Sequence, residues 1–412
     1  MTHPTNPTRR RLLVTTGGAL TWAGLTSLSH ADMGEKEEAA KAAAAAKETD
    51  KAFPDYVAWK DADSMILHSS NTIETKRTAF GQSGITPVNR LYVRNNVNPP
   101  SNDIVEDPDA WEVEIAGVDS PKTLTVAELK QLGTTSVAMV LQCAGNGRGW
   151  FPHEPSGTQW ETGAAGCVVF TGVPVKKVLE ALGGMDSDAK YMTGTGGEEI
   201  PEGIDPDTVR VERSVPLEAV EDALLAWEIN GEPLPLAHGG PLRMIVPGYI
   251  GINNIKYVKK LAFTEEQSSA NIQQNSYRWT EVGVKGSPEY DSIWESPPKS
   301  WITSPVDPDE ELKAGKVQIV GVAMGGMSNA KKIEVSTNGG KDWKEAEFVG
   351  LDLGKYAWRQ FAFEADLDAG THELACRVTN EDGDTQPEER RENNRGYLNN
   401  SWRDHAVEIT VA

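Results

Sequence analysis

The chain has 412 residues, a formal net charge of −21 and three cysteines. That length exceeds one ordinary hydrophobic core, and we expect two domains plus tails. The negative charge would repel phosphate and argues against nucleic acid as a partner, whereas it can attract a basic protein or serve solubility and salt adaptation. Three cysteines exclude a disulfide framework, although Cys143 and Cys167 can in principle pair.

The first 31 residues have the features of an export signal. Arg9-Arg10-Arg11 precede a mildly apolar run over 12–28, and Ser29-His30-Ala31 supplies small residues before a cleavage point. Twin arginines before a weak apolar run are typical of a Tat-type signal and predict a periplasmic protein exported in the folded state. The alternative is an uncleaved anchor, but the run is rich in Gly and Thr, so we expect no membrane span after cleavage. Residues 32–54 form an Ala- and charge-rich leader without chemical groups of interest.

Residues 55–300 combine short apolar runs with Gly/Pro turns and a few helical patches. The spacing of apolar residues predicts helices over 124–132, 175–182 and 220–229, and a strand over 136–141. Because strands and helices do not alternate regularly, the pattern predicts an α+β domain.

Beyond residue 300 the pattern changes to alternating strands separated by turns. A linker is predicted at Pro297-Pro298 and Ser304-Pro305-Val306-Asp307-Pro308, where the prolines break the pattern. The predicted strands lie at 317–322, 332–336, 358–363, 372–378 and 406–411. Short strands at this spacing predict an immunoglobulin-like β-sandwich over residues 301–412.

Several common enzyme motifs are missing from the sequence. The glycines at 145–149 lack the spacing and the surrounding β-α-β unit of a dinucleotide loop. No Gly-x-Ser-x-Gly elbow occurs, and no two histidines have zinc-ligand spacing. No Cys-x-x-Cys-His occurs either, so we expect no haem in this chain.

The most informative stretch is Leu141-Gln142-Cys143-Ala144-Gly145-Asn146-Gly147-Arg148. It places a cysteine at the end of an apolar strand, in a Gly-rich turn with an arginine nearby. A thiolate in such a setting suits metal ligation or nucleophilic chemistry. The residues alone leave four roles open for Cys143: nucleophile, metal ligand, half of a disulfide, or packing thiol.

This stretch and several others, in the same order, resemble the sulfite oxidase family of molybdopterin enzymes, and most of all its bacterial periplasmic sulfite dehydrogenases. The resemblance covers about residues 88–278 and 393–403. It implies that Cys143 ligates molybdenum held by molybdopterin in a catalytic domain over 55–300, and that 301–412 form a dimerisation domain. It further implies that a homodimer oxidises sulfite, or a similar small oxyanion, and passes electrons to a separate c-type cytochrome. An interdomain support is the alternative role of the sandwich.

The resemblance also assigns roles to individual residues outside the cysteine turn. It implies that Arg94, Arg148 and Arg395 converge to hold the anion, that Trp160 lines the same pocket, and that Tyr277 orients the substrate. Without it, the arginines are ordinary surface residues, Trp160 is a core aromatic and Tyr277 is a loop tyrosine. The positions implied to hold the cofactor are Asn96, His238, Arg243, Gly251, Asn253 and Lys256.

One departure and two rival functions accompany the resemblance. Asn96 stands where the family commonly has histidine after Arg-Asn, so a titratable group is lost there. Nitrate reductases share a closely related cysteine motif, which leaves a molybdenum enzyme acting on nitrate or on S- or N-oxides as the first alternative. A non-catalytic periplasmic binding protein is the second. The b5-type haem domain of the animal enzymes is not found in the sequence, so a separate electron acceptor is expected.

Overall fold

The computed structural model describes residues 53–412, which form one unit. The predicted export signal at 1–31 and nearly all of the leader at 32–54 lie outside the described residues. Within residues 53–412 no helix is long and apolar enough to cross a membrane.

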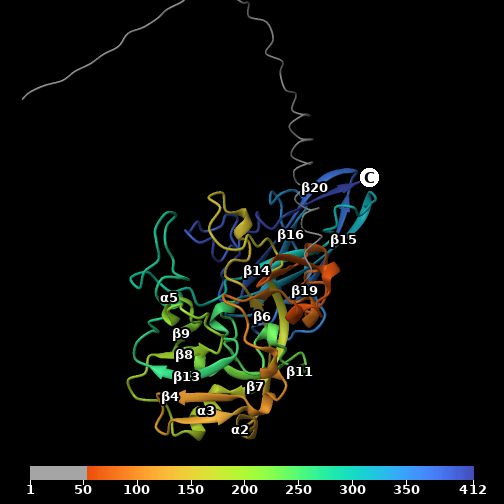
Figure 1. The fold of residues 1–412 in the computed structure, drawn as a ribbon. Coiled ribbons are helices and arrows are strands. Elements are labelled where there is room, and N and C mark those ends of the chain that lie inside the picture. Colours follow the sequence, from red (N-terminus) through yellow and green to blue (C-terminus); the bar gives the residue numbers. More distant parts are fainter. Residues whose placement is uncertain (1–52) are drawn as a thin grey trace, which may run out of the picture. The chain divides into compact units, whose positions relative to one another are not determined.

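The catalytic part, predicted over 55–300, is built from strands in three sheets (Figure 1). The first sheet has the order β1-β2-β3, with β1 (Met65–Ser69), β2 (Thr72–Thr75) and β3 (Val93–Arg94). The second has the order β11-β10-β7-β6, with β12 also paired to β10: β6 (Thr135–Gln142), β7 (Ala165–Pro174), β10 (Leu224–Ile229), β11 (Glu232–Pro233) and β12 (Arg243–Ile245). The third has the order β5-β4-β13-β8-β9: β4 (Glu112–Ala116), β5 (Lys122–Thr125), β8 (Tyr191–Gly196), β9 (Glu212–Pro216) and β13 (Val258–Thr264). The third sheet is mixed, because β13 is parallel to β4 and antiparallel to β8, in agreement with the α+β prediction.

The helices of the described residues are short. They are α2 (Val126–Gln131), α3 (Val175–Ala181), α4 (Pro206–Val209) and α5 (Asn271–Gln274), with 3-10 turns between strands. Thr125 and Glu128 form a reciprocal capping box that starts α2 where the apolar spacing predicts it. The helix predicted over 220–229 is wrong, because residues 224–229 form β10 in the interior of the second sheet. Its nearly continuous burial made a strand buried on both faces look like a helix.

The C-terminal part is the predicted β-sandwich of two four-stranded sheets. One sheet contains β14 (Lys299–Ser304), β15 (Gly315–Met324), β18 (Glu347–Val349) and β19 (Arg359–Leu367). The other contains β16 (Ala330–Ser336), β17 (Lys344–Glu345), β20 (Gly370–Asn380) and β21 (Val407–Val411). The predicted linker is only partly correct, because Lys299–Ser304 between its prolines pairs with β15 as the first strand of the sandwich.

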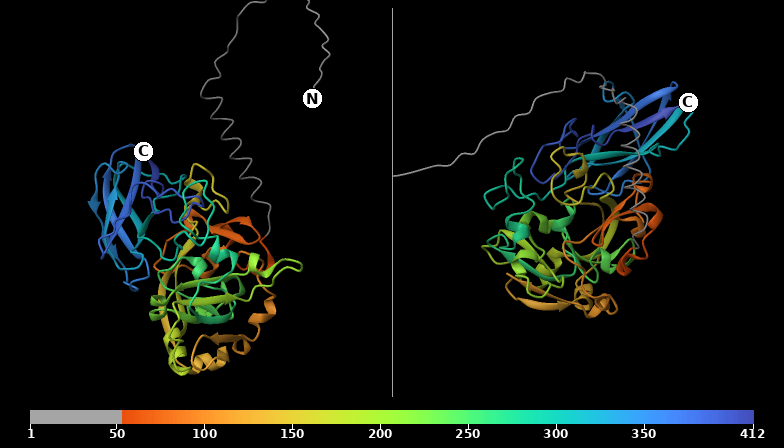
Figure 2. Two further views of the ribbon diagram at one scale, coloured as in Figure 1. Left: turned by 90° about the vertical axis from the view of Figure 1, so that its left-hand side faces the viewer. Right: turned by 45° about the horizontal axis from the view of Figure 1, so that its top comes forward.

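The sandwich packs against the catalytic part (Figures 1 and 2), and two of the contacts between them are an aromatic cluster and a chain segment. The ring of Phe80 lies edge-on to Trp301 and to Trp358, at centroid distances of 5.3 and 5.6 Å. The second contact is made by residues 393–400, the return segment, which leave the sandwich after β20 and reach the cysteine turn before β21 begins. The amide of Leu398 donates to the carbonyl oxygen of Ala144 at 2.7 Å. The side chain of Asn399 donates to the carbonyl oxygen of Gly147 at 3.0 Å.

Candidate active site

Cys143 follows directly on β6 and is held in a tight turn. Its amide donates to the carbonyl oxygen of Ala164 at 2.9 Å, and its own carbonyl accepts from the amide of Asn146 at 3.0 Å. The Asn146 side chain accepts from the amide of Ala164 at 3.2 Å and donates to Gln142 at 3.3 Å. These polar neighbours therefore shape the turn, and they leave the half-buried Cys143 thiol free and facing a cavity.

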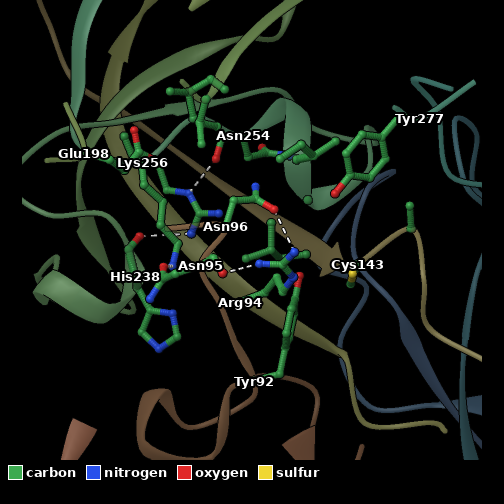
Figure 3. A pocket seen from close by; sticks show the side chains of 17 residues that line it. Tyr92, Arg94, Asn95, Asn96, Cys143, Glu198, His238, Asn254, Lys256 and Tyr277 are labelled. Atoms are coloured by element: carbon green, nitrogen blue, oxygen red, sulfur yellow. Dashed lines mark hydrogen bonds between the residues drawn. The ribbon is translucent and has the colours of Figure 1, made fainter. Parts of the chain in front are cut away.

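The cavity brings together most of the residues singled out in the sequence (Figure 3). Cys143 and Tyr277 lie on one side, here called the thiol end, and Glu198, Lys256 and His238 lie on the opposite side. Those predicted from the sequence that line it are Arg94, Asn96, Cys143, His238, Arg243, Gly251, Lys256 and Tyr277.

His238, Arg243 and Lys256 form the cationic end of the cavity. Lys256 Nζ donates to the side chain of Asn95 at 2.6 Å and to the carbonyl oxygen of Ala237 at 2.5 Å. Arg243 donates to the carbonyl oxygens of Asn254 and His238 at 3.1 and 3.0 Å. Burial, and then repulsion by neighbouring cations, holds the pKa values of Lys256 and His238 well below their usual range. After burial, Arg243 lowers the pKa of Lys256 most, and Lys60 lowers that of His238 most.

Lys60 lies next to His238, outside the cavity lining, and orients its imidazole ring. Its ammonium group lies 2.7 Å from Nε2 of His238 and donates to the carbonyl oxygens of Val88 and Leu91, both at 2.6 Å. Because an ammonium group has no acceptor, Nε2 must accept, which assigns the proton of a neutral His238 to Nδ1. Burial holds the pKa of Lys60 well below its usual range as well.

Glu198 is the single carboxyl group among the residues that line the cavity. Burial raises its pKa to about 7, while the nearby Lys256 ammonium lowers it. The cationic end thus has more positive than negative groups, with little water to screen them. Such a set of donors fits an anionic group such as the phosphate of molybdopterin.

Gly251 borders the cavity where there is no room for a side chain. A Cβ there would lie 2.9 Å from the Tyr92 hydroxyl and 3.1 Å from the carbonyl oxygen of Gln142. The glycine therefore lets residues 251–254 approach the strand that carries Cys143. At Gly248, three residues earlier, a Cβ would meet Met327 and Tyr356 instead.

Tyr277 and Arg94 define the thiol end. The Tyr277 backbone has φ +53°, and burial raises the pKa of its phenol to about 12, with Tyr397 adding to the rise and Arg94 and Arg148 opposing it. Arg94 donates to the side chain of Asn96 at 2.7 Å and to the carbonyl oxygen of Asn95. A protonated phenol and a guanidinium therefore face the space beside the Cys143 thiol (Figure 3).

Arg148 and Arg395 do not line this cavity. Buried Arg148 donates from Nε to the carbonyl oxygen of Arg395 at 2.8 Å and from Nη1 to that of Thr158 at 2.9 Å. Its guanidinium lies 5.5 Å from the centre of the Tyr397 ring. The exposed side chain of Arg395 lines a separate surface hollow beside Arg278 and Lys285. The three guanidinium groups therefore do not converge on this cavity. Arg148 instead donates a hydrogen bond to the main-chain oxygen of Arg395.

Trp160 and Asn253 lie behind the cavity wall. Trp160 is fully buried and packs edge-on against Tyr92, which lines the cavity, at 6.2 Å. Its indole nitrogen has no hydrogen-bond partner among the described residues. Asn253 is also fully buried and uses both ends of its amide, accepting from Arg213 at 3.1 Å and donating to the carbonyl oxygen of Trp294 at 3.0 Å. Its side chain is therefore structural here.

Four further residues belong to the site although none of them was predicted from the sequence. Asn95 could have been predicted most easily, because it lies between Arg94 and Asn96, which the family resemblance singled out. Tyr92 lies three residues before Asn95. Lys60 and Glu198 carry no local signal, since a lysine after a tryptophan and a glutamate in a Gly-Glu-Glu loop look like ordinary surface residues.

Comparison with known proteins agrees with this arrangement. Residues 100–272 match the oxidoreductase molybdopterin-binding domain, and residues 290–412 match the Mo-co oxidoreductase dimerisation domain. Sulfite oxidase of Arabidopsis thaliana is 31% identical over 362 residues, spanning 80% of this chain and 89% of that protein. Mitochondrial sulfite oxidase of Macaca fascicularis is 29% identical over 384 residues, spanning 85% of this chain and 68% of that protein.

The fold has a counterpart among solved structures. The sulfane dehydrogenase SoxCD from Paracoccus pantotrophus superposes with a TM-score of 0.68 at 24% identity, over 84% of this chain and 89% of that chain. At that identity the likeness concerns the fold. Together with the two matched domains and the relatives, it leads to one assignment: the chain is an oxidoreductase of the sulfite oxidase family of molybdopterin enzymes.

Proposed function

We propose that the protein oxidises sulfite to sulfate at a molybdenum–molybdopterin centre and passes the electrons to a separate c-type cytochrome. The observation that carries the proposal is the division of one cavity into a thiol end and a cationic end. A soft thiolate suits molybdenum, and buried cations suit a phosphate. Both requirements of the cofactor are therefore met by side chains that face the same space.

Cys143 would hold the metal, while Lys256, His238 and Arg243 would hold the phosphate end of the cofactor. The bound cofactor supplies the two-electron redox chemistry and the transfer of oxygen. The protein supplies position and charge. Asn95 keeps the Lys256 ammonium in place, and Lys60 keeps His238 in the tautomer whose proton is on Nδ1.

Arg94 and Tyr277 would receive the sulfite anion. The guanidinium of Arg94 attracts an oxyanion and can donate to two of its oxygens. The phenol of Tyr277, whose pKa is raised to about 12, stays protonated at neutral pH and can donate a hydrogen bond to a substrate oxygen. Arg148 would contribute its charge from behind Tyr397 rather than by direct contact.

The remaining parts of the proposal concern partners and location. The net charge of −21 supports an encounter with a basic cytochrome, whose approach would be steered by opposite charge. The matched dimerisation domain supports a homodimer. The twin-arginine segment supports export of the folded, cofactor-loaded protein to the periplasm.

The deciding experiment measures sulfite-dependent reduction of cytochrome c and of ferricyanide by purified protein of known molybdenum content. Turnover with both acceptors is expected. Nitrate reduction by a chemical reductant, with no sulfite turnover, would replace the proposal by the nitrate alternative. Cys143→Ser is the matched variant, and it should fold but retain almost no molybdenum. Full activity of that variant would overturn the assignment of Cys143 as the metal ligand, and wild-type protein that contains no molybdenum would favour a non-catalytic binding protein.

A further inference from the structure

Tyr277 belongs to a stack of four side chains, in which two phenol rings lie between two guanidinium groups. Its ring is stacked on that of Tyr397 at 5.0 Å, with an angle of 19° between the planes. The guanidinium carbon of Arg148 lies 5.5 Å from the centre of the Tyr397 ring, and that of Arg213 lies 5.4 Å from the centre of the Tyr277 ring. Each phenol ring thus has a cation on its outer side, an arrangement in which the ring quadrupole attracts the charge.

Arg213 is the member of this stack that the catalytic assignment does not use. It is on β9 and is fully buried. No carboxylate within residues 53–412 forms an ion pair with it, and its donors go to neutral oxygens instead. A buried charge without a counter-ion is costly, and its retention calls for a function. Burial lowers the pKa of Arg213 to about 10, so it remains charged at neutral pH.

The hydrogen bonds of Arg213 hold both ends of the loop that carries Tyr277. Nη1 donates to the carbonyl oxygen of Ile272 at 3.1 Å, five residues before the tyrosine. Nη2 donates to the carbonyl oxygen of Ile293 at 3.4 Å. The amide of Ile293 in turn donates to the carbonyl oxygen of Tyr277 at 2.7 Å. One planar group therefore joins the two ends of the loop and also covers the face of the ring between them.

The loop needs this support because Tyr277 is in an unfavourable backbone conformation. Its φ of +53° lies in the left-handed region, which residues with a side chain rarely adopt unless their surroundings enforce it. The Tyr397 hydroxyl accepts from the amide of Tyr277 at 3.4 Å, on the side opposite to Arg213. The side chain of Asn393 holds Tyr397 by hydrogen bonds to its amide and carbonyl groups, both at 2.9 Å.

We propose that Arg213 is a positioning residue for Tyr277: it fixes the loop and the ring so that the phenol points at the substrate beside Cys143. This rests on the proposed function in one respect, namely that Tyr277 contacts the substrate. Arg213 does not touch the cavity and acts entirely through the tyrosine. Tyr397 has the same role from the other face.

The test is a double-mutant cycle on kcat/KM for sulfite with Arg213→Gln, Tyr277→Phe and the double variant. Arg213→Gln should lower kcat/KM about 100-fold, the loss that a misplacement of about 1 Å can produce. If Arg213 acts through Tyr277, the double variant will be no slower than Tyr277→Phe alone. Independent losses that multiply in the double variant would overturn the proposal.

A matched control and a conservative variant separate positioning from general damage. Arg77 also donates to a backbone carbonyl oxygen, that of Ile302, and to Thr162, but is not part of the stack. In the double variant of Arg77→Gln and Tyr277→Phe, the fold losses in kcat/KM from the two single variants should multiply. Arg213→Lys keeps the charge but lacks the planar donors, so it should recover only part of kcat/KM. Full recovery would show that charge alone matters and would overturn the role in holding the loop.

A second readout does not depend on any substrate. In cofactor-free protein, Arg213→Gln should speed amide hydrogen exchange in peptides spanning 272–293 by about tenfold or more, because the loop ends lose their shared partner. Unchanged exchange would overturn the proposal whatever the enzyme oxidises. If instead the exchange changes but wild-type protein does not turn over sulfite, the positioning role stands and the proposed function fails.

Discussion

The side chain of Arg148 donates to the backbone carbonyl oxygen of Arg395 at 2.8 Å, so these two arginines meet through a main-chain oxygen and not at a shared anion. The bond ties the turn that carries Cys143 to the return segment. Arg148 is buried, and its second donor goes to the carbonyl oxygen of Thr158.

Arg148→Lys should therefore lower both stability and substrate affinity. A lysine cannot reproduce two separately directed donors, and the loss of one charged hydrogen bond at a buried site costs about 1.5–3 kcal/mol. We expect a lower Tm and a raised KM for sulfite with a smaller change in kcat. Measuring KM and kcat beside thermal unfolding checks both parts. Arg148→Gln, which also removes the charge, is the comparison, and an unchanged KM in that variant would show that Arg148 adds no charge to the pocket.

Asn96→His should introduce a pH dependence that the wild-type enzyme lacks. Position 96 is exposed at the cavity, so the new imidazole should titrate near its ordinary pKa of about 6.5. Below that pH the added positive charge should lower KM for the oxyanion, and above it the gain should disappear. The measurement is KM against pH, taken as the ratio to wild type so that ionisation of sulfite cancels. Asn96→Ala, which also releases Arg94, is the control and should show no such step.

Glu198 should make the cofactor-free protein less stable as the pH rises. Its pKa of about 7 in the folded chain is above the value of 4.5 in the unfolded chain, so the folded state binds the proton more tightly. The stabilising contribution is complete below pH 4.5 and is lost as the pH rises through 7. The Tm difference between Glu198→Gln and wild type should thus increase from pH 4.5 to pH 8. A difference that stays constant over this range would mean that Glu198 is already ionised at pH 4.5.

Phe80→Ala should loosen the contact between the sandwich and the catalytic part. Phe80 is 1% exposed and lies against Trp301 and Trp358, so its truncation should cost about 3–5 kcal/mol of unfolding free energy. Denaturant unfolding measures this. Leu351→Ala, at a side chain that is 81% exposed, should change stability by less than about 0.5 kcal/mol. Similar values for the two variants would contradict the interpretation of Phe80 as a core contact.

The sequence predicted much of the fold because local signals were strong. The apolar spacing over 124–132 and the alternation along β15 and β20 are local signals, and the structure has a helix and strands where they were expected. The strand β10 was misread because burial on both faces removes the period of two on which the prediction depends. All three residues of the cationic end, His238, Arg243 and Lys256, were predicted through the family resemblance, and all three line the cavity. Lys60 and Arg213 could not be found from the sequence, because their roles depend on distant residues. Lys60 contacts a residue 178 positions away, and Arg213 contacts residues 59 and 80 positions away.

The path of the return segment determines how far the protein can be divided. Residues 393–400 belong by sequence to the sandwich, between β20 and β21, yet Tyr397 stacks on the proposed substrate-binding phenol and Leu398 bonds to the residue after Cys143. A fragment that ends at residue 300 would keep the cysteine, the cationic end and Arg213, but it would lack the ring that stacks on Tyr277 and the hydrogen bond that Leu398 gives to the cysteine turn. The catalytic part therefore cannot be separated from the sandwich without loss of these contacts. Substitutions that change the structure of the sandwich should also change the rate of turnover.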